Sequence, residues 1–228
     1  MLYLLPNLIG ETSKEALFLP IGLEKVLKEI DFFIVESPKA ARQLLKNYTL
    51  KNSLQETPFL SLDKTTTRQD IEEILKLLKT GQTGGLIVDA GLPCLGDPGS
   101  RLVYQANRAK VAVETLSGPS SIIIALQRSG LYSQQFMFHG YPPKKPEERK
   151  EFLEKLPEKV VHIFIETPYR NEYFFQDCLQ TLPDSTKLSL AVDLTMEGEY
   201  VQTKAIEKWK AMEQVDLKKR CAIFLLYK

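Results

Sequence analysis

The sequence has few cysteines, few histidines and no long apolar segment. Its 228 residues include three cysteines, Cys94, Cys178 and Cys221, far apart and odd in number. These are typical of reduced thiols in a cytosolic protein rather than of a disulfide framework, and the two histidines add no zinc-binding spacing. No apolar stretch reaches the roughly 18 residues of a membrane span, and the first residues lack the form of a signal peptide. We therefore expect a cytoplasmic protein with no metal and no membrane partner.

The sequence also lacks an excess of either charge. Lys and Arg number 30 and Asp and Glu number 29, which gives a net charge of +1. This excludes a strongly cationic nucleic-acid binder as a description of the whole surface, although a local basic patch stays open. The 43% of hydrophobic residues is typical of a globular protein, and a chain of this length can bury a large core.

Three widespread motifs are missing. The sequence has no Gly-x-Gly-x-x-Gly after its first apolar run, no phosphate-binding Gly-x-x-x-x-Gly-Lys-Ser/Thr and no Gly-x-Ser-x-Gly. His139 and His162 are isolated in sequence, which favours a core or surface role for both over membership of a catalytic triad.

Short apolar runs alternate with amphipathic segments along the chain. A helix over 65–81 is expected to start with a capping box at Thr66 and Gln69 and to end at Gly81. Because the strands are apolar rather than alternating, they predict mostly parallel sheets with helices on both faces. We expect two α/β domains, 1–116 and 117–228. The expected strands are 2–5, 32–35, 58–62, 86–88, 111–114, 136–138, 160–165, 188–192 and 222–227, and the expected helices are 14–29, 40–45, 65–81, 101–109, 122–127, 147–156, 169–182 and 206–212.

The loop Asp89–Ser100 is the strongest local signal. It follows an apolar run and holds three glycines, two prolines and two aspartates. Ligands of parallel sheets bind beyond the carboxyl ends of strands, glycine permits close backbone approach, and proline stiffens the rest. An ordinary connection is the alternative, but such loops are usually shorter. The composition favours a binding loop for a polar ligand.

Other polar segments follow other predicted strands. Ser117–Ser121 is consistent with a ligand-binding turn or with a simple helix cap. Glu166–Arg170 and Glu36–Lys39 are consistent with site residues at a sheet edge or with surface charge pairs. A cluster of basic residues near 144–150 is consistent with phosphate contact, although Glu147 and Glu148 favour a solvated helix end.

Taken together, these segments resemble the tetrapyrrole methylase superfamily, the class III S-adenosylmethionine-dependent methyltransferases. Within it, the sequence is most similar to the rRNA small subunit methyltransferase I group, which methylates a cytidine ribose 2′-hydroxyl in 16S rRNA. The segments that carry the resemblance are 89–103, 116–121, 130–136, 139–144 and 166–170. The sequence departs from the group at Pro6–Glu11, at Glu36–Lys39, and at Asp193–Met196, where a lysine is replaced by Met196. It also ends after the second domain, where many members continue.

The resemblance implies a fold with the S-adenosylmethionine cofactor in a cleft between two domains, in a homodimer. It implies cofactor contacts in the first domain and at the domain boundary from Pro6, Asp89, Gly91, Pro93, Asp97, Pro119, Ser120 and Ser121. It implies cofactor contacts in the second domain from Phe138, Gly140, Tyr141, Thr167 and Leu194.

Methyl transfer to a ribose hydroxyl also requires removal of a proton. Glu36 and Glu166 are the predicted catalytic carboxylates, with Asp89 as a further candidate for the base or hydroxyl orienter. The expected activity is methylation of ribosomal RNA. Two alternatives stay open: a methylase of a corrin or porphyrin precursor on the same scaffold, and a non-catalytic S-adenosylmethionine-binding protein derived from such an enzyme.

Overall fold

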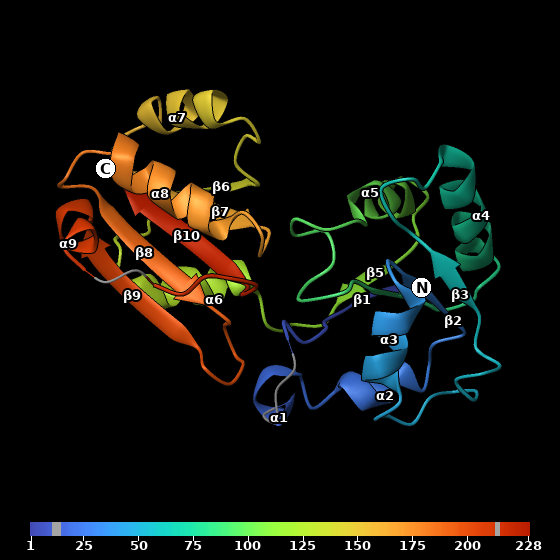
Figure 1. The fold of residues 1–228 in the computed structure, drawn as a ribbon. Coiled ribbons are helices and arrows are strands. Elements are labelled where there is room, and N and C mark those ends of the chain that lie inside the picture. The colour runs from blue at the N-terminus through green and yellow to red at the C-terminus, as the bar shows by residue number, and fades with distance from the viewer. Residues whose placement is uncertain (11–14, 213–214) are drawn as a thin grey trace. The chain divides into compact units, whose positions relative to one another are not determined.

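The computed structural model describes residues 1–10, 15–212 and 215–228. The chain forms two compact units, Met1–Ser120 and Ser121–Lys228, each with its own five-stranded sheet (Figure 1). The expected α/β class is confirmed. The division into domains at 116/117 stays a prediction, and the compact units divide four residues later.

The sheet of the first unit is entirely parallel, as the apolar runs predict. Its strand order is β3-β2-β4-β1-β5. Register pairs Leu5 of β1 with Ile87 of β4, and Val35 of β2 with Ile87 on the other side. Every residue of β2 is buried, as expected for a strand covered on both faces. The strands are β1 Leu2–Leu5, β2 Phe32–Val35, β3 Phe59–Ser61, β4 Gly84–Ile87 and β5 Val113–Thr115.

Helices cover both faces of this sheet and enclose two separate cores. Phe33 and Val35 pack with α2 and α3, whereas Phe32 and Ile34 pack with α4 and α5 on the opposite face. The helices of the unit are α1 Glu15–Phe18, α2 Leu23–Leu27, α3 Pro38–Leu45, α4 Arg68–Lys79 and α5 Ser100–Arg108.

Two local predictions for the first unit are wrong. The expected helix over 14–29 begins at Lys14, which lies outside the described residues, and from residue 15 onward it is two short helices, because Pro20 interrupts the segment between α1 and α2. The capping box of α4 consists of Thr67 and Asp70 rather than Thr66 and Gln69: Thr67 accepts from the Asp70 backbone, and Asp70 accepts from the Thr67 backbone. Thr66 instead accepts a hydrogen bond from the Asp63 backbone.

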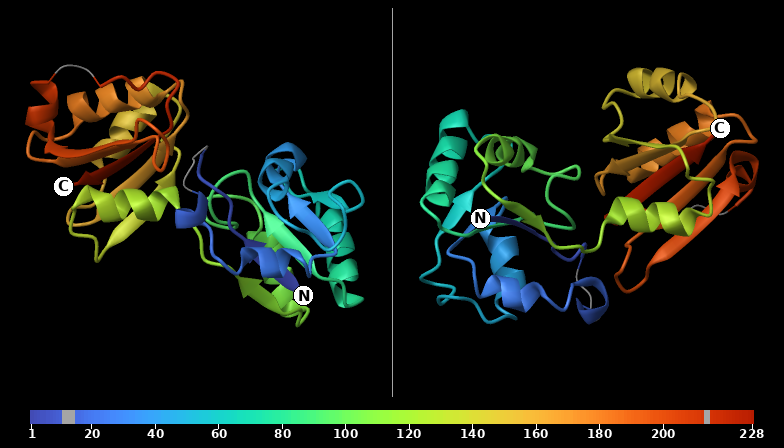
Figure 2. Two further views of the ribbon diagram at one scale, coloured as in Figure 1. Left: turned by 90° about the horizontal axis from the view of Figure 1, so that it is seen from below. Right: turned by 180° about the vertical axis from the view of Figure 1, so that it is seen from behind.

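The sheet of the second unit is mixed, with the order β6-β7-β10-β8-β9. β6 and β7 are parallel, and the other neighbouring pairs are antiparallel. Figure 1 shows α6 on one face of this sheet and α7 and α8 on the other, and Figure 2 gives two further views. The elements are α6 Ser121–Ser129, β6 Phe136–Gly140, α7 Pro146–Glu154, β7 Val161–Glu166, α8 Asn171–Thr181, β8 Lys187–Val192, β9 Tyr200–Ala205, α9 Ile206–Lys210 and β10 Ala222–Tyr227.

Strand β9 was not expected. Its sequence mixes Gln202, Thr203 and Lys204 with apolar residues, and all its residues are half-buried because it lies at the sheet edge. A polar edge strand lacks the apolar run that identifies the central strands. In the described ranges, no helix has the length and apolar character needed to cross a bilayer, and no three His, Cys, Asp or Glu side chains cluster as metal ligands would.

The two histidines form a hydrogen-bonded pair within the second unit. The Nε2 atom of His162 lies 2.8 Å from the Pro157 carbonyl and must donate to it, so its Nδ1 accepts from His139 Nε2 at 2.9 Å. His139 also stacks on Phe164, with ring centroids 4.8 Å apart. A core role for His162, which is fully buried, is therefore confirmed.

Acid is expected to destabilise the protein through this pair. Burial, and then His162, lowers the pKa of His139 from 6.5 to about 4, and burial also lowers the pKa of His162. Because the unfolded chain binds protons more readily, stability is full above about pH 6.5 and is lost as the pH falls toward about 4. Urea midpoints at about pH 7 and about pH 5 measure this loss. The midpoint should fall less in His139→Phe than in the wild type, and an equal fall in both would contradict the assignment.

Candidate functional site

The topology of the first unit directs attention to the ends of β1 and β4. In this sheet β1 and β4 are neighbours, with β2 on one side of the pair and β5 on the other. The connection from β1 to β2 therefore runs in the opposite direction to the connection from β4 to β5. The intervening helices consequently lie on opposite faces, which opens a crevice beyond the carboxyl ends of these neighbouring strands. Asn7 follows β1 and Asp89 follows β4, so both lie where parallel sheets bind ligands.

Asn7 joins the loops that follow these two strands. Its Nδ2 atom donates to the carbonyls of Val88 and Asp89, at 2.9 and 3.0 Å. Its backbone N–H donates to the Gly91 carbonyl at 2.8 Å, and the Gly91 N–H donates back to Leu8 at 3.3 Å. Sequence reasoning missed Asn7, because nothing local distinguishes it from an ordinary turn residue.

The loop after β5 packs on the same pair. A Cβ atom added to Gly118 would lie 2.1 Å from Pro6 Cβ, so only glycine allows this approach. Gly91 has a φ of +75°, and a Cβ there would lie 3.5 Å from the Pro119 carbonyl. The structure therefore brings together three of the predicted segments, those of Pro6, Gly91 and Pro119. Pro93 and Ser120 are buried beside them, and Ser121 begins α6.

Three carboxylates interact near these loops. Glu36 directly follows β2 and accepts a hydrogen bond from the Asp89 backbone. Burial raises the pKa of Glu36, and the charges of Asp89 and Asp97 raise it further. Burial and Asp89 likewise raise the pKa of Asp97, against the opposing charge of Lys64. Asp89 itself is exposed. The result is a region of negative potential that a bound cation would relieve.

A hollow of about 300 Å³ lies between the loop after β1 and helix α3. Its lining combines apolar side chains such as Leu8 and Leu44 with polar ones. The residues that line it are Asn7, Leu8, Ile9, Gly10, Ala40, Gln43, Leu44, Lys46, Asn47 and Asp89.

The predicted residues of the second unit lie at one edge of its sheet. Glu166 of β7 and Val192 of β8 pair with the same residue, Ala222 of β10, so Thr167 and Leu194 follow strand ends at the same level. Gly140 ends β6 beside Phe164, where the register shifts and its φ is +69°. Gly140 and Tyr141 therefore lie toward the same edge as Thr167 and Leu194, and Phe138 lies two residues before the end of β6.

Glu166 is held by its neighbours on every side. Its side chain is 1% exposed and forms an ion pair with Arg170. Its Oε1 atom accepts from the Thr167 backbone at 2.6 Å and from Arg170 Nε at 3.0 Å. The charge pair considered for this segment thus has a buried carboxylate and a half-buried arginine. The predicted catalytic role of Glu166 stays a prediction, and these contacts favour a role in positioning Thr167.

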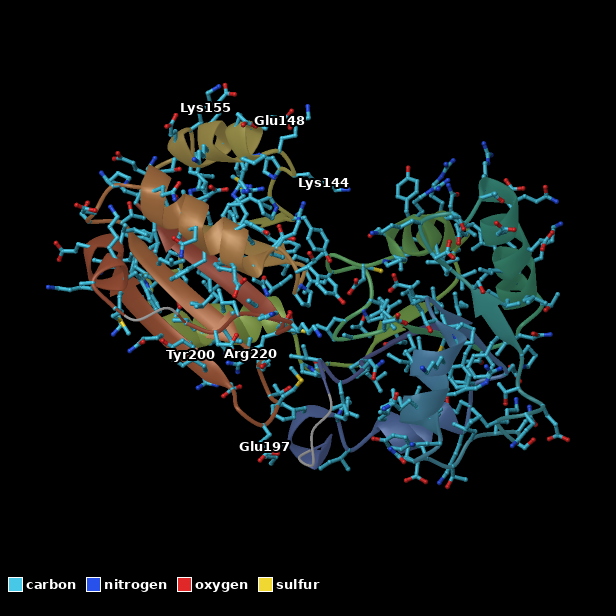
Figure 3. All side chains as sticks on the ribbon, in the orientation of Figure 1. Lys144, Glu148, Lys155, Glu197, Tyr200 and Arg220 are labelled. Carbon is cyan, nitrogen blue, oxygen red and sulfur yellow. The ribbon has the colours of Figure 1, made fainter. Side chains whose placement is uncertain are left out.

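The basic cluster near residue 144 contains one residue of a different kind. Arg149 is 5% exposed and forms an ion pair with buried Asp177 of α8, so it is not part of a solvated helix end. It also donates to the carbonyls of Pro143 and Lys144, both at 3.1 Å. Lys144 and Glu148 project into solvent, as Figure 3 shows.

Known proteins resemble the whole of this arrangement. The family model described as Tetrapyrrole (Corrin/Porphyrin) Methylases matches residues 19–208. A "Ribosomal RNA small subunit methyltransferase I" of Streptococcus pyogenes serotype M1 is 31% identical over 226 residues, 98% of this chain and 75% of that protein. Another with the same name, from Buchnera aphidicola subsp. Schizaphis graminum (strain Sg), is 28% identical over 223 residues, 96% of this chain and 75% of that protein.

Solved structures share the fold at low sequence identity. Diphthine synthase superimposes with a TM-score of 0.62 at 13% identity, covering 100% of this chain and 89% of that chain. A cobalt precorrin-4 methyltransferase gives 0.59 at 12% identity, covering 99% and 94%. These structures show the fold. The family model, which spans most of the sequence, and the two relatives named as ribosomal RNA methyltransferases show that the chain belongs to the tetrapyrrole methylases and is an S-adenosylmethionine-dependent methyltransferase.

Proposed function

We propose that this protein transfers a methyl group from S-adenosylmethionine to a ribose 2′-hydroxyl of ribosomal RNA, in the cytoplasm. The substrate class is supported by the relatives named as ribosomal RNA methyltransferases, which align with nearly the whole chain. The observation that carries the proposal is the packing of three loops, those after β1, β4 and β5, into one cradle. This cradle lies beyond the carboxyl ends of β1 and β4, where the connections of the sheet reverse direction. The homodimer implied by the resemblance stays a prediction.

The cradle has the chemistry that the cofactor requires. S-adenosylmethionine carries a sulfonium and an ammonium, and the carboxylates of Glu36, Asp89 and Asp97 create the negative potential that favours such cations. Gly91 and Gly118 let the loops after β1, β4 and β5 pack closely enough to form this cradle. We assign cofactor contacts to Pro6, Asp89, Gly91, Pro93, Asp97, Pro119, Ser120 and Ser121, and in the second unit to Phe138, Gly140, Tyr141, Thr167 and Leu194.

The residues of the site perform two tasks in the transfer. The sulfonium supplies an activated methyl group, so the protein mainly holds the acceptor oxygen in line with the carbon–sulfur bond. As that bond breaks and the carbon–oxygen bond forms, the hydroxyl proton must leave to a base. Glu36 is our choice for this base, because burial and its acidic neighbours bring its pKa closer to neutrality.

Cofactor binding and methyl transfer, measured separately, test the proposal. Calorimetry should show S-adenosylmethionine binding, and Asp89→Asn should weaken it by about tenfold or more because a charged contact is lost. Asp184→Asn, in an exposed ion pair with Lys210, is the matched control and should bind normally. Radiolabelled methyl groups should appear in the ribose of undermethylated small ribosomal subunits.

The remaining outcomes separate the alternatives. Binding with methyl transfer to a corrin or porphyrin precursor, and none to RNA, would replace the RNA substrate. Binding with no transfer to any acceptor would indicate a non-catalytic descendant. An absence of S-adenosylmethionine binding at millimolar concentration would refute the cofactor assignment.

A further inference from the structure

We propose that Tyr169, Tyr173 and Lys144 form a stacking surface for a single-stranded segment of the RNA substrate. This inference rests on the proposed function and adds the part of the second unit that grips the acceptor. The two tyrosines are the most exposed aromatic side chains of this unit, at 79% and 69%.

The two rings lie at the start of α8, Tyr173 on the helix and Tyr169 on the turn before it. Phe174, Phe175 and Cys178 face the core of the unit. Tyr173 lies in the first turn of α8, and Tyr169 lies two residues before the helix, in the turn that leads into it. The Arg170 N–H donates to the Thr167 carbonyl at 2.9 Å and the Phe174 N–H donates to the Arg170 carbonyl at 3.0 Å, so hydrogen-bonded turns join this segment to α8. The two exposed rings are therefore four residues apart in one continuous hydrogen-bonded segment at the start of α8.

Arg149 holds the backbone of a second basic residue, Lys144, close to α8. Its guanidinium bonds at once to the Lys144 carbonyl, at 3.1 Å, and to Asp177, with Nε 2.6 Å from Oδ2. Asp177 lies one helical turn after Tyr173 on α8, so Arg149 fastens the backbone of Lys144 near Tyr173. Within the described residues Lys144 forms no ion pair, and its side chain is exposed (Figure 3).

This combination suits RNA better than a protein partner. Unpaired bases stack on exposed aromatic rings, and a nearby lysine neutralises a phosphate. A protein partner would favour a continuous apolar patch, but Glu172, Gln176 and Gln180 are the other residues of this side of the helix.

Fluorescence anisotropy with a labelled small-subunit rRNA hairpin that has a single-stranded loop tests this surface. Tyr169→Ala/Tyr173→Ala should weaken RNA binding by at least about tenfold, whereas Tyr169→Phe/Tyr173→Phe, which keeps both rings, should stay within about threefold of the wild type. Lys144→Gln should lower the slope of log affinity against log salt by about 0.7, because one phosphate contact is lost. Tyr104→Ala, at an exposed tyrosine of the first unit, is the control and should bind RNA as the wild type does.

Several results would overturn the surface. These are no RNA binding by the wild type, a double alanine variant within about twofold of Tyr104→Ala, or an equal loss of S-adenosylmethionine affinity in that variant. A change of oligomeric state in the double alanine variant would instead assign the tyrosines to a second copy of the chain. If the wild type binds the hairpin but transfers no methyl group, the proposed function fails, and the binding comparison still decides the surface.

Discussion

Glu36→Gln is expected to lower kcat by about 100-fold to 10,000-fold while weakening S-adenosylmethionine binding less than Asp89→Asn does. The carboxylate is half-buried, and its raised pKa makes it a stronger base than an exposed glutamate. The amide keeps the shape and the acceptor oxygen for the Asp89 N–H but cannot take a proton. Single-turnover methyl transfer to small ribosomal subunits, with cofactor affinity measured by calorimetry, separates these effects.

The pH dependence follows from the same assignment. Because the base must be ionised, the wild-type kcat should fall as the pH falls through the raised pKa of Glu36, and the residual activity of Glu36→Gln should lack this step. Glu73→Gln, on the exposed face of α4, is the matched control and should behave as the wild type. Normal turnover in Glu36→Gln would remove Glu36 from the mechanism.

Glu166→Gln distinguishes positioning from catalysis. The Arg170 ion pair and the Thr167 N–H occupy the Glu166 carboxylate, so the amide should disturb Thr167. We expect KM for S-adenosylmethionine to rise and kcat at saturation to change less than in Glu36→Gln. An unchanged KM with a fall in kcat as large as that of Glu36→Gln would instead indicate that Glu166 is the base.

Local patterns predicted most strands and the loops after them. An apolar run such as 32–35 is buried on both faces of whichever sheet it joins. The glycines and prolines of 89–100 restrict that segment to an irregular loop whatever surrounds it. These properties depend on neighbours in sequence, which is why the pattern alone identifies them.

Contacts between distant residues were not predictable in this way. Asn7 bonds to carbonyls more than 80 positions away, and Arg149 is buried only because Asp177 lies opposite it. In sequence, Arg149 is one of several basic residues near Glu147 and Glu148. The pairing that turns a surface charge into a buried one requires knowledge of which helices pack together.

Arg149→Ala is expected to destabilise the protein by about 3–5 kcal/mol, because it leaves the buried Asp177 carboxylate without its main partner. The variant also frees the carbonyls of Pro143 and Lys144, so the segment after Gly140 and Tyr141 loses its attachment to α8. Arg149→Lys should recover only part of this, since a lysine cannot bond to the carboxylate and both carbonyls in one plane. Urea unfolding monitored by Trp209 fluorescence measures the loss within the second unit.

The double variant Arg149→Met/Asp177→Leu separates the ion pair from the attachment. Removing both charges avoids an unpaired buried carboxylate, so most of the stability should return, as is found for other buried pairs replaced by apolar side chains. The Pro143 and Lys144 carbonyls still lack their donor, so RNA affinity should stay below that of the wild type. Lys155→Met, which breaks an exposed ion pair with Glu151, is the control and should unfold at the wild-type midpoint. If Arg149→Ala also unfolds at the wild-type midpoint, the buried ion pair between Arg149 and Asp177 does not hold α7 on α8. The placement of Lys144 near the two tyrosines then loses its support.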